Sequence, residues 1–212
     1  MCTEANFQFG DMPIDTQIPV PRQWLIKITQ YSCGFPNLAP SGCTQYFYGS
    51  PTGIVKSFNF DGQLHLANQK HNICVRRERN KCRICWTPAE STDFQLSGMS
   101  GLATSSAKGF NTGSVCCAYG TAGTKTSGYD CLIIPGAEKD TNGAVKADQF
   151  CGRSQGLVTA SMMTGMPGVT VCSRRQPFMI TFISDQWEFA DATDMEEKGG
   201  IGFKLHYMQE DC

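Results

Sequence analysis

The chain has 212 residues, of which 41% are hydrophobic and 17% charged, and its formal net charge is −1. This composition supplies enough apolar surface for a folded core and excludes a disordered tail. A net charge near zero gives no overall field that would draw the chain to nucleic acid or to an anionic membrane. No apolar run reaches the length of a membrane-spanning helix.

Taken in chain order, the sequence shows many short strand patterns and few helix patterns. Runs of β-branched and aromatic residues end at Gly, Pro, Asn or Asp, which is typical of strands bounded by turns. The predicted strands cover residues 24–30, 54–60, 73–76, 83–86, 132–134, 178–183 and 203–207. Residues 97–128, rich in Gly, Ser, Thr and Ala, are expected to form a long loop. The pattern predicts an all-β protein, an antiparallel β-sandwich or barrel.

Twelve cysteines are spread along the chain. Such a number is typical of an oxidising compartment and a disulfide framework, so the chain is expected to be secreted and extracellular. The residues from Met1 to Asn6 have neither the basic start nor the apolar stretch of a secretory signal. A disulfide protein without a signal is interpreted as a piece of a longer chain.

One internal repeat divides the sequence. Residues 24–33 align without gaps on residues 203–212, and both copies begin with an aromatic residue, share a Gln and close on a Cys. Upstream of each copy a Cys precedes an aromatic strand, at Cys2 and at Cys172. Residues 1–33 are therefore interpreted as the C-terminal portion of a preceding unit. Residues 34–212 are interpreted as a complete unit with a Gly/Ser-rich insertion.

Short motifs in this second unit follow a characteristic order. They are Cys33-Gly34, Asn72-Ile73-Cys74, Tyr129-Asp130-Cys131-Leu132, Phe150-Cys151-Gly152, Phe182-Ile183-Ser184-Asp185 and Gly202-Phe203-Lys204-Leu205-His206-Tyr207. With these motifs the chain resembles a CUB domain, an extracellular antiparallel β-sandwich of the jelly-roll type stapled by disulfides. Other segments, such as Arg22-Gln23-Trp24 and His65-Leu66-Ala67-Asn68-Gln69, resemble secreted arthropod proteins with tandem CUB domains and uncharacterised function.

The resemblance implies particular disulfides. Cys151 is expected to pair with Cys172, and Cys33 with Cys74, for which Cys43 is a competing partner. The family usually carries a further Cys where this chain has Ser127, so the other pairings stay unassigned.

The resemblance also implies a calcium site of low ligand count. Some CUB domains bind calcium through a Glu and two Asp residues, and Asp130 and Asp185 match the two Asp positions. The Glu is missing, because no acidic residue occurs from Ser97 to Ser127. A hard cation needs several oxygen ligands, so no cofactor is expected, with calcium at Asp130 and Asp185 as the alternative.

Two motifs suggest chemistry that the surrounding sequence does not support. Cys82 and Cys85 form a CxxC, but the run around them is predicted to be a strand, so structural disulfides are favoured over a zinc or redox site. The segment around Ser154 matches the GxSxG nucleophile elbow, followed by Asp185 and His206 in hydrolase order. No βαβ pattern precedes it, so a serine hydrolase is a remote alternative and no catalytic residue is expected.

A basic run occurs from Arg76 to Arg83, broken by Glu78. It could contact a sulfated glycan or an acidic partner surface. A solvated hairpin, whose charges discourage edge pairing, is the favoured interpretation.

These observations predict a secreted, noncatalytic binding or assembly protein that contacts an extracellular protein or a matrix component through loops or a sheet edge. No nucleic-acid partner and no membrane span are expected. The alternative is a noncatalytic CUB segment of a secreted protease or larger extracellular assembly. The ligand and the oligomeric state are not indicated.

Overall fold

The computed structural model describes residues 25–62, 64–90, 92–96, 130–139, 148–150, 170–185 and 200–212. The chain divides into two units, Met1–Leu38 and Ala39–Cys212. In the first unit, residues 25–30 carry no strand, so the strand predicted at 24–30 is not confirmed over the residues described. Two turns follow, in which Phe35 N donates to Ser32 O and Leu38 N to Phe35 O. Whether residues 1–33 belong to a preceding CUB-like unit stays a prediction.

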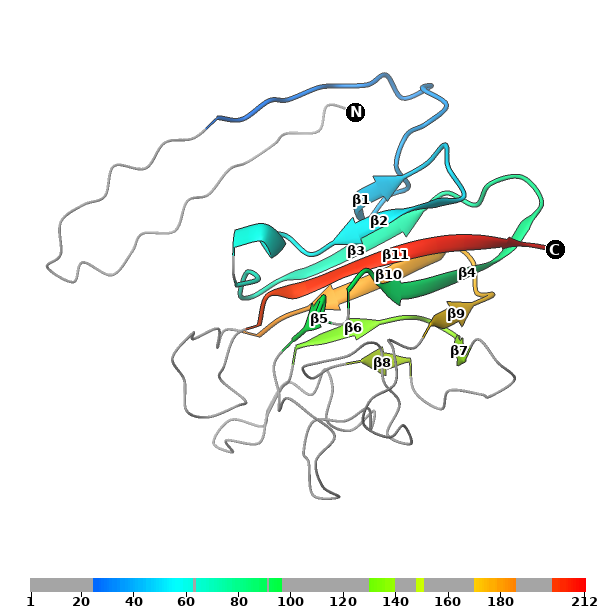
Figure 1. Cartoon of the computed structure of the whole chain (residues 1–212). Coiled ribbons are helices and arrows are strands. Elements are labelled where there is room, and N and C mark those ends of the chain that lie inside the picture. The colour runs from blue at the N-terminus through cyan, green and yellow to red at the C-terminus, as the bar shows by residue number, and fades with distance from the viewer. Residues whose placement is uncertain are drawn as a thin grey trace, which may run out of the picture. The chain divides into compact units, whose positions relative to one another are not determined.

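The second unit contains two β-sheets (Figure 1). The first sheet has the order β1-β3-β10-β6-β8. Its strands are β1 (Cys43–Phe47), β3 (Lys70–Val75), β10 (Phe178–Ile183), β6 (Cys131–Ile133) and β8 (Gln149–Phe150). All neighbours are antiparallel except β1 and β3, which run parallel.

The second sheet has the order β2-β11-β4-β9-β7, and β5 pairs separately with β11. Its strands are β2 (Thr52–Lys56), β11 (Gly202–Asp211), β4 (Lys81–Pro88), β9 (Val171–Ser173), β7 (Ala137–Lys139) and β5 (Phe94–Gln95). A short 3-10 helix, η1 (Phe60–Gly62), follows β2. Among the residues that the structure describes, no helix is long and apolar enough to span a membrane.

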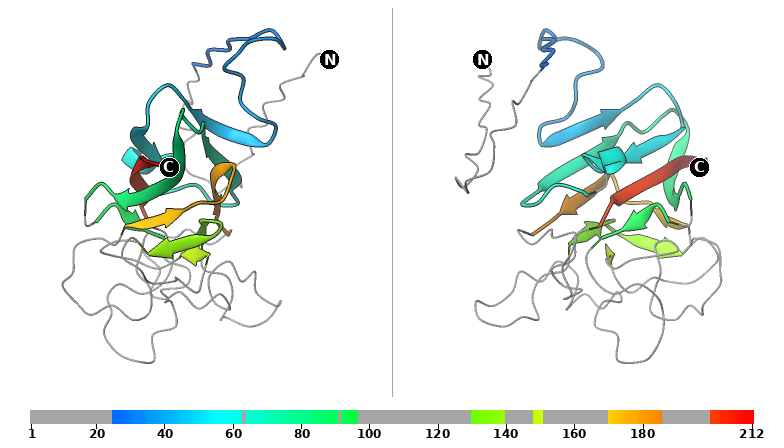
Figure 2. Two further views of the ribbon diagram at one scale, coloured as in Figure 1. Left: turned by 90° about the vertical axis from the view of Figure 1, so that its right-hand side faces the viewer. Right: turned by 60° about the vertical axis from the view of Figure 1, so that its left-hand side comes forward.

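Alternating side chains build the core between the two sheets, whose ribbons are seen from two further directions in Figure 2. In β10 the buried positions include Phe178, Ile180 and Phe182, the face predicted from the sequence. Ring contacts join the two sheets, with centroids 5.4 Å apart for Phe182 and Phe203 and 6.2 Å apart for Phe47 and Tyr207. Burying each such side chain stabilises the fold by roughly 1.5–3 kcal/mol. The prediction of an all-β, disulfide-stapled sandwich is confirmed.

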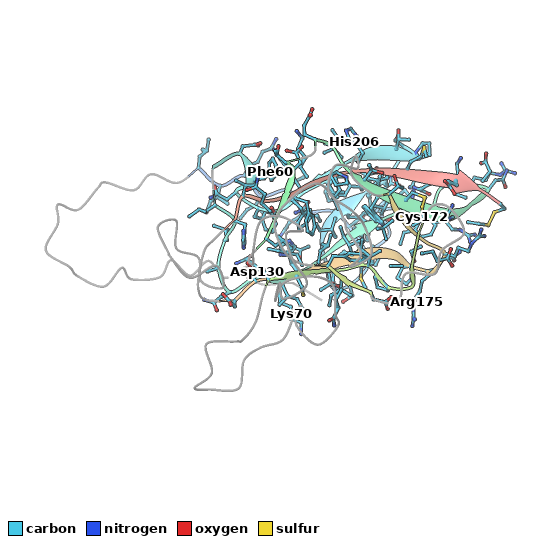
Figure 3. The ribbon with its side chains drawn as sticks, turned by 60° about the horizontal axis from the view of Figure 1, so that its bottom comes forward. Phe60, Lys70, Asp130, Cys172, Arg175 and His206 are labelled. Carbon is cyan, nitrogen blue, oxygen red and sulfur yellow. A yellow bond between two sulfur atoms is a disulfide. The ribbon has the colours of Figure 1, made fainter. Side chains whose placement is uncertain are left out.

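The strand register defines two ends of the sandwich. At one end Ile183 pairs with Lys70 and with Cys131, so the residues before β3 and β6 and after β10 leave the sheet together. We call this the histidine end, after His65. At the other end Val75 pairs with Phe178, so the connections 76–80 and 174–177 leave together. We call this the arginine end (right side of Figure 1). Figure 3 labels Lys70, from the histidine end of β3, and Arg175, from the connection 174–177.

Candidate functional site

The histidine end brings together residues from four separate connections. His65 precedes β3, Asp130 directly precedes β6, Asp185 follows β10, and Gly200 precedes β11. Because β3, β10 and β6 are neighbours in one sheet, their connections meet at one point although the residues are far apart in the sequence.

A buried histidine and a buried carboxylate lie at the centre of this end. His65 Nε2 lies 3.0 Å from Asp130 Oδ2, and both side chains are 0% exposed. His65 Nδ1 lies 2.7 Å from Gly200 O, and the backbone N of His65 donates to the same carbonyl at 2.9 Å. The other oxygen of the carboxylate, Asp130 Oδ1, accepts from Asp185 N at 2.9 Å.

This geometry fixes where protons lie. The carbonyl of Gly200 can only accept, so Nδ1 of His65 carries a proton. Nε2 faces a carboxylate oxygen, so a second proton lies between His65 and Asp130, since two facing lone pairs would repel. Buried charges are tolerated only when paired in this way. The pair therefore ties the connection before β3 to the start of β6 and, through Gly200, to the start of β11.

The sequence did not reveal the role of His65. Its partner in the chain is 65 positions away, and a lone histidine in a loop carries no local pattern. The signal that could have found it is the Tyr-Asp strand itself, because an Asp expected to be buried needs a donor.

The disulfides differ from those that the family resemblance implied. Cys43 bonds to Cys74, so the expected Cys33–Cys74 bond is wrong and the competing pair is correct. The physical reason is that β1 lies beside β3, which brings Cys43 and Cys74 to a Cα distance of 5.8 Å. Cys33 belongs to the first unit and is an exposed free thiol.

The expected Cys151–Cys172 bond is also wrong. Cys172 bonds to Cys85, because these residues lie directly opposite each other on the antiparallel strands β9 and β4. Cys151 lies outside the described residues. Cys131 is disulfide-bonded as well, and its partner lies outside the described part of the chain. The remaining described bond joins Cys82 at the start of β4 to Cys212.

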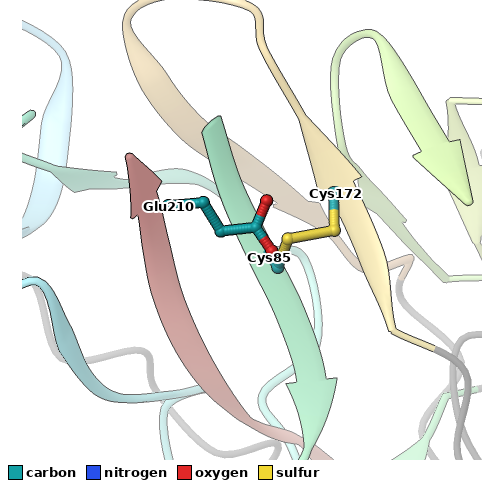
Figure 4. A group of neighbouring side chains, drawn as sticks. All are labelled: Cys85, Cys172 and Glu210. Atoms are coloured by element: carbon teal, nitrogen blue, oxygen red, sulfur yellow. A yellow bond between two sulfur atoms is a disulfide. The ribbon is translucent and has the colours of Figure 1, made fainter. Parts of the chain in front are cut away.

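The CxxC is therefore structural, as predicted. Within the described residues, one group of potential metal ligands occurs, formed by Cys85, Cys172 and Glu210, whose ligand atoms lie within 4.8 Å of one another (Figure 4). Two of these three atoms are the sulfurs of a disulfide, which offer no thiolate to a metal. Cys82 and Cys85 point to different partners, as expected for positions three apart on a strand.

The described members of the serine-hydrolase alternative are not assembled. Asp185 lies at the histidine end of the first sheet, where its backbone N is bonded to Asp130. His206 lies in the middle of β11 and is exposed on the outer face of the second sheet (Figure 3). Ser154 lies outside the described residues.

The connection 76–80 at the arginine end is held by several hydrogen bonds. Gln209, 2% exposed, accepts from Glu78 N at 2.9 Å and donates to Arg76 O at 3.0 Å. The Glu78 carboxylate accepts from Gly49 N at 2.8 Å, and the pKa of Glu78 is lowered by this bond and by Arg76. The guanidinium of Arg76 also lies 5.3 Å from the centre of the Tyr48 ring.

Comparison with known families identifies the sandwich. The sequence model of the animal CUB domain matches residues 40–210. The chain belongs to the animal CUB domain family. This confirms the resemblance seen in the sequence, and CUB domains are in general noncatalytic modules of protein interaction. Comparison with curated protein sequences gives no match.

Solved structures similar to this chain include two that are named for their CUB domains. The CUB1-EGF-CUB2 domains of rat MASP-1 match with 17% identity and a TM-score of 0.41 over 79% of this chain and 42% of that chain. The CUB1-EGF-CUB2 domain of human MASP-1/3 matches with 17% identity and a TM-score of 0.37 over 77% and 43%. The full extracellular region of zebrafish Gpr126/Adgrg6 matches with 15% identity and a TM-score of 0.39 over 81% and 15%. The chain thus spans less than half the length of each of these structures.

Calcium at Asp130 and Asp185 of this CUB domain stays a prediction. The two residues do meet, but through the backbone N of Asp185, and both oxygens of Asp130 already accept hydrogen bonds. Calcium takes about six to eight oxygen ligands, whereas the described neighbour of Asp130 Oδ2 is a proton-bearing histidine ring. The hydrogen bonds of the described residues thus leave the predicted site short of oxygen ligands. The acidic side chains from Glu188 to Glu197 lie outside them.

Proposed function

We propose that this chain is a noncatalytic extracellular binding module that contacts another protein or a matrix component through the ends of its sandwich. Membership of the animal CUB domain family over residues 40–210 carries the proposal. The three described disulfides support an oxidising location, because such bonds persist outside the cytosol.

The ends are favoured over the faces because loops on a rigid scaffold tolerate variation and carry recognition. The described connections at both ends are fixed by buried groups, His65 with Asp130 at one end and Gln209 at the other. Fixed loops lose little entropy on binding, so more of the contact energy is retained as affinity.

The test uses the oxidised chain, labelled and applied to decellularised extracellular matrix, with unlabelled chain as competitor. Saturable retention that the competitor removes is expected, and reduced, alkylated chain is the control that has lost its fold. Cross-linking and mass spectrometry then identify the retained component. Retention that is equal for native and reduced chain would contradict the proposal.

The serine-hydrolase alternative has a separate test. A fluorophosphonate probe is expected to leave Ser154 unlabelled in the oxidised chain, with Ser154→Ala as the blank. Stoichiometric labelling that disappears in S154A would replace the binding module by an enzyme.

A further inference from the structure

Cationic side chains gather at the arginine end, on the connections 76–80 and 174–177 and on the start of β4. Four described carboxylates at this end are paired with one of them, whereas Asp148 accepts a hydrogen bond from Ala137 N instead. Glu78 lies 3.2 Å from Arg76, Asp211 2.7 Å from Lys81, Glu210 2.8 Å from Arg83, and Glu138 3.7 Å from Arg174.

Three arginines at this end are not part of these ion pairs, namely Arg77, Arg79 and Arg175. All three are exposed, and no ion pair or side-chain hydrogen bond joins them to any of the described residues. They therefore give the arginine end a surplus of positive charge, although the chain as a whole has a net charge of −1.

The backbone places these arginines on one surface. Val75 and Phe178 are directly paired, and neighbouring strands lie about 4.8 Å apart. The connections that carry Arg77, Arg79 and Arg175 therefore start side by side. Arg175 is labelled at this end in Figure 3.

Both connections are held in position before any ligand arrives. Arg76 and Glu78 are engaged with Tyr48 and Gly49, so the alternate residues Arg77 and Arg79 are the exposed ones. On the other connection, Arg175 N donates to Ser173 Oγ at 3.1 Å, and that hydroxyl donates to Pro135 O at 2.5 Å. Prior ordering of the backbone lowers the cost of binding.

We propose that the arginine end binds a sulfated glycan, with Arg77, Arg79 and Arg175 contacting its sulfate groups. All three free cations are arginines, whose planar guanidinium binds tetrahedral oxyanions through two parallel hydrogen bonds. The inference rests on the proposed function, for which it names a class of matrix partner and a surface.

An acidic protein segment fits this surface less well. Protein interfaces draw most of their affinity from aromatic and apolar anchors in desolvated pockets. The aromatic ring that contacts the connection 76–80 is that of Tyr48, and Arg76 already lies over it. Surface charges without such anchors suit a solvated polyanion, whose binding depends on many weak, salt-sensitive contacts.

The test is the affinity of the full oxidised chain for heparin oligosaccharides of defined length, measured by surface plasmon resonance at several salt concentrations. Each of R77A, R79A and R175A is expected to weaken binding by about two- to fivefold, as for single exposed charge contacts. The triple variant should lose roughly tenfold or more and show a shallower salt dependence. The matched control is K70A, a change at the opposite end of the sandwich. Lys70 is exposed and has no ion-pair partner among the described residues. It should bind like the unchanged chain.

Several outcomes would overturn the proposal. The first is the absence of heparin binding near 0.15 M salt, and the second is an equal loss of heparin affinity in K70A and in the arginine variants. The others are undiminished binding to desulfated heparin and a preference for a poly-glutamate peptide over heparin. Unchanged near-ultraviolet circular dichroism shows that each variant is folded. Retention on matrix that survives heparinase digestion, with no heparin binding, would remove this inference and leave the proposed function standing.

Discussion

His71 is buried without a hydrogen-bond partner for either ring nitrogen among the described residues. It lies in β3, is 7% exposed, and its ring contacts Phe58 at 4.8 Å and Phe182 at 5.5 Å. The imidazole therefore packs as an aromatic ring. Burial lowers the pKa of His71 below its ordinary value of 6.5, because the charged form would lose its solvation.

This predicts a loss of stability in mild acid. The unfolded chain takes up a proton at His71 near pH 6.5, before the folded chain does. The free energy of unfolding is therefore highest, with respect to this group, above that pH, and it declines as the pH falls toward the lowered pKa. Replacing His71 by Phe keeps the ring and should flatten this decline, as measured by urea unfolding between about pH 7.5 and 5. The control H206N should keep the decline, and an equally steep decline in H71F would contradict the assignment.

Gly202 occupies a position that no other residue fits. Its φ is 94°, and a Cβ there would overlap Ser57 Oγ, which accepts from Phe203 N at 3.1 Å. Gly202→Ala should cost about 2 kcal/mol or more in unfolding free energy, from the unfavourable φ and the displaced hydroxyl. Gly34→Ala is the control, because nothing lies within 4 Å of its Cβ position. Equal stability of the two variants by chemical denaturation would show that the turn can rearrange.

Gln209 joins two elements, since it lies in β11 and bonds to both sides of the connection 76–80. Gln209→Leu keeps a side chain of similar size but removes the hydrogen bonds to Glu78 N and to Arg76 O. We expect a loss of about 2 kcal/mol and faster hydrogen exchange of the amides in residues 76–80. Gln45→Leu is the matched control, because Gln45 donates to Lys56 O in an exposed position and its loss should cost less than about 0.5 kcal/mol. Unchanged exchange in Q209L would mean that other contacts hold the connection.

The sequence patterns predicted strands well where the alternating apolar side chains face a second sheet. The strand at residues 178–183 was found with its correct bounds, and the strand at 203–207 extends to Asp211 in the structure. The repeat at 24–33 shows the opposite case. Ile26 and Ile28 align on the buried Leu205 and Tyr207 but are 47% and 62% exposed, and residues 25–30 form no strand. A strand pattern is realised only when a partner supplies the hydrogen bonds.

Very short strands and pairings between distant segments could not be predicted from the sequence. β5 and β8 have two residues each, too few for a period of two to be recognised. The parallel pairing of β1 with β3 depends on the arrangement of the whole sheet. For the whole molecule, the order of motifs identified the family. It could not say which of two cysteines ten positions apart, Cys33 or Cys43, would lie beside Cys74.

The disulfide pattern gives a prediction for the whole molecule. Non-reducing peptide mapping of the native chain should recover Cys43–Cys74, Cys82–Cys212 and Cys85–Cys172, because sheet neighbours place each pair together. Alkylation before digestion should modify Cys33, the exposed thiol. A peptide joining Cys33 to Cys74, or Cys151 to Cys172, would contradict this pairing.

β4 also constrains how the molecule can mature during its biosynthesis. Its two cysteines, Cys82 and Cys85, bond to residues 130 and 87 positions later. During synthesis both thiols are present long before their partner cysteines have been made. In that interval each can react with the other thiol or with cysteines earlier in the chain. Premature bonds are therefore expected, and thiol–disulfide exchange must undo them before the second sheet can close. Yield from a cell should consequently depend more on a disulfide isomerase than on the supply of oxidant.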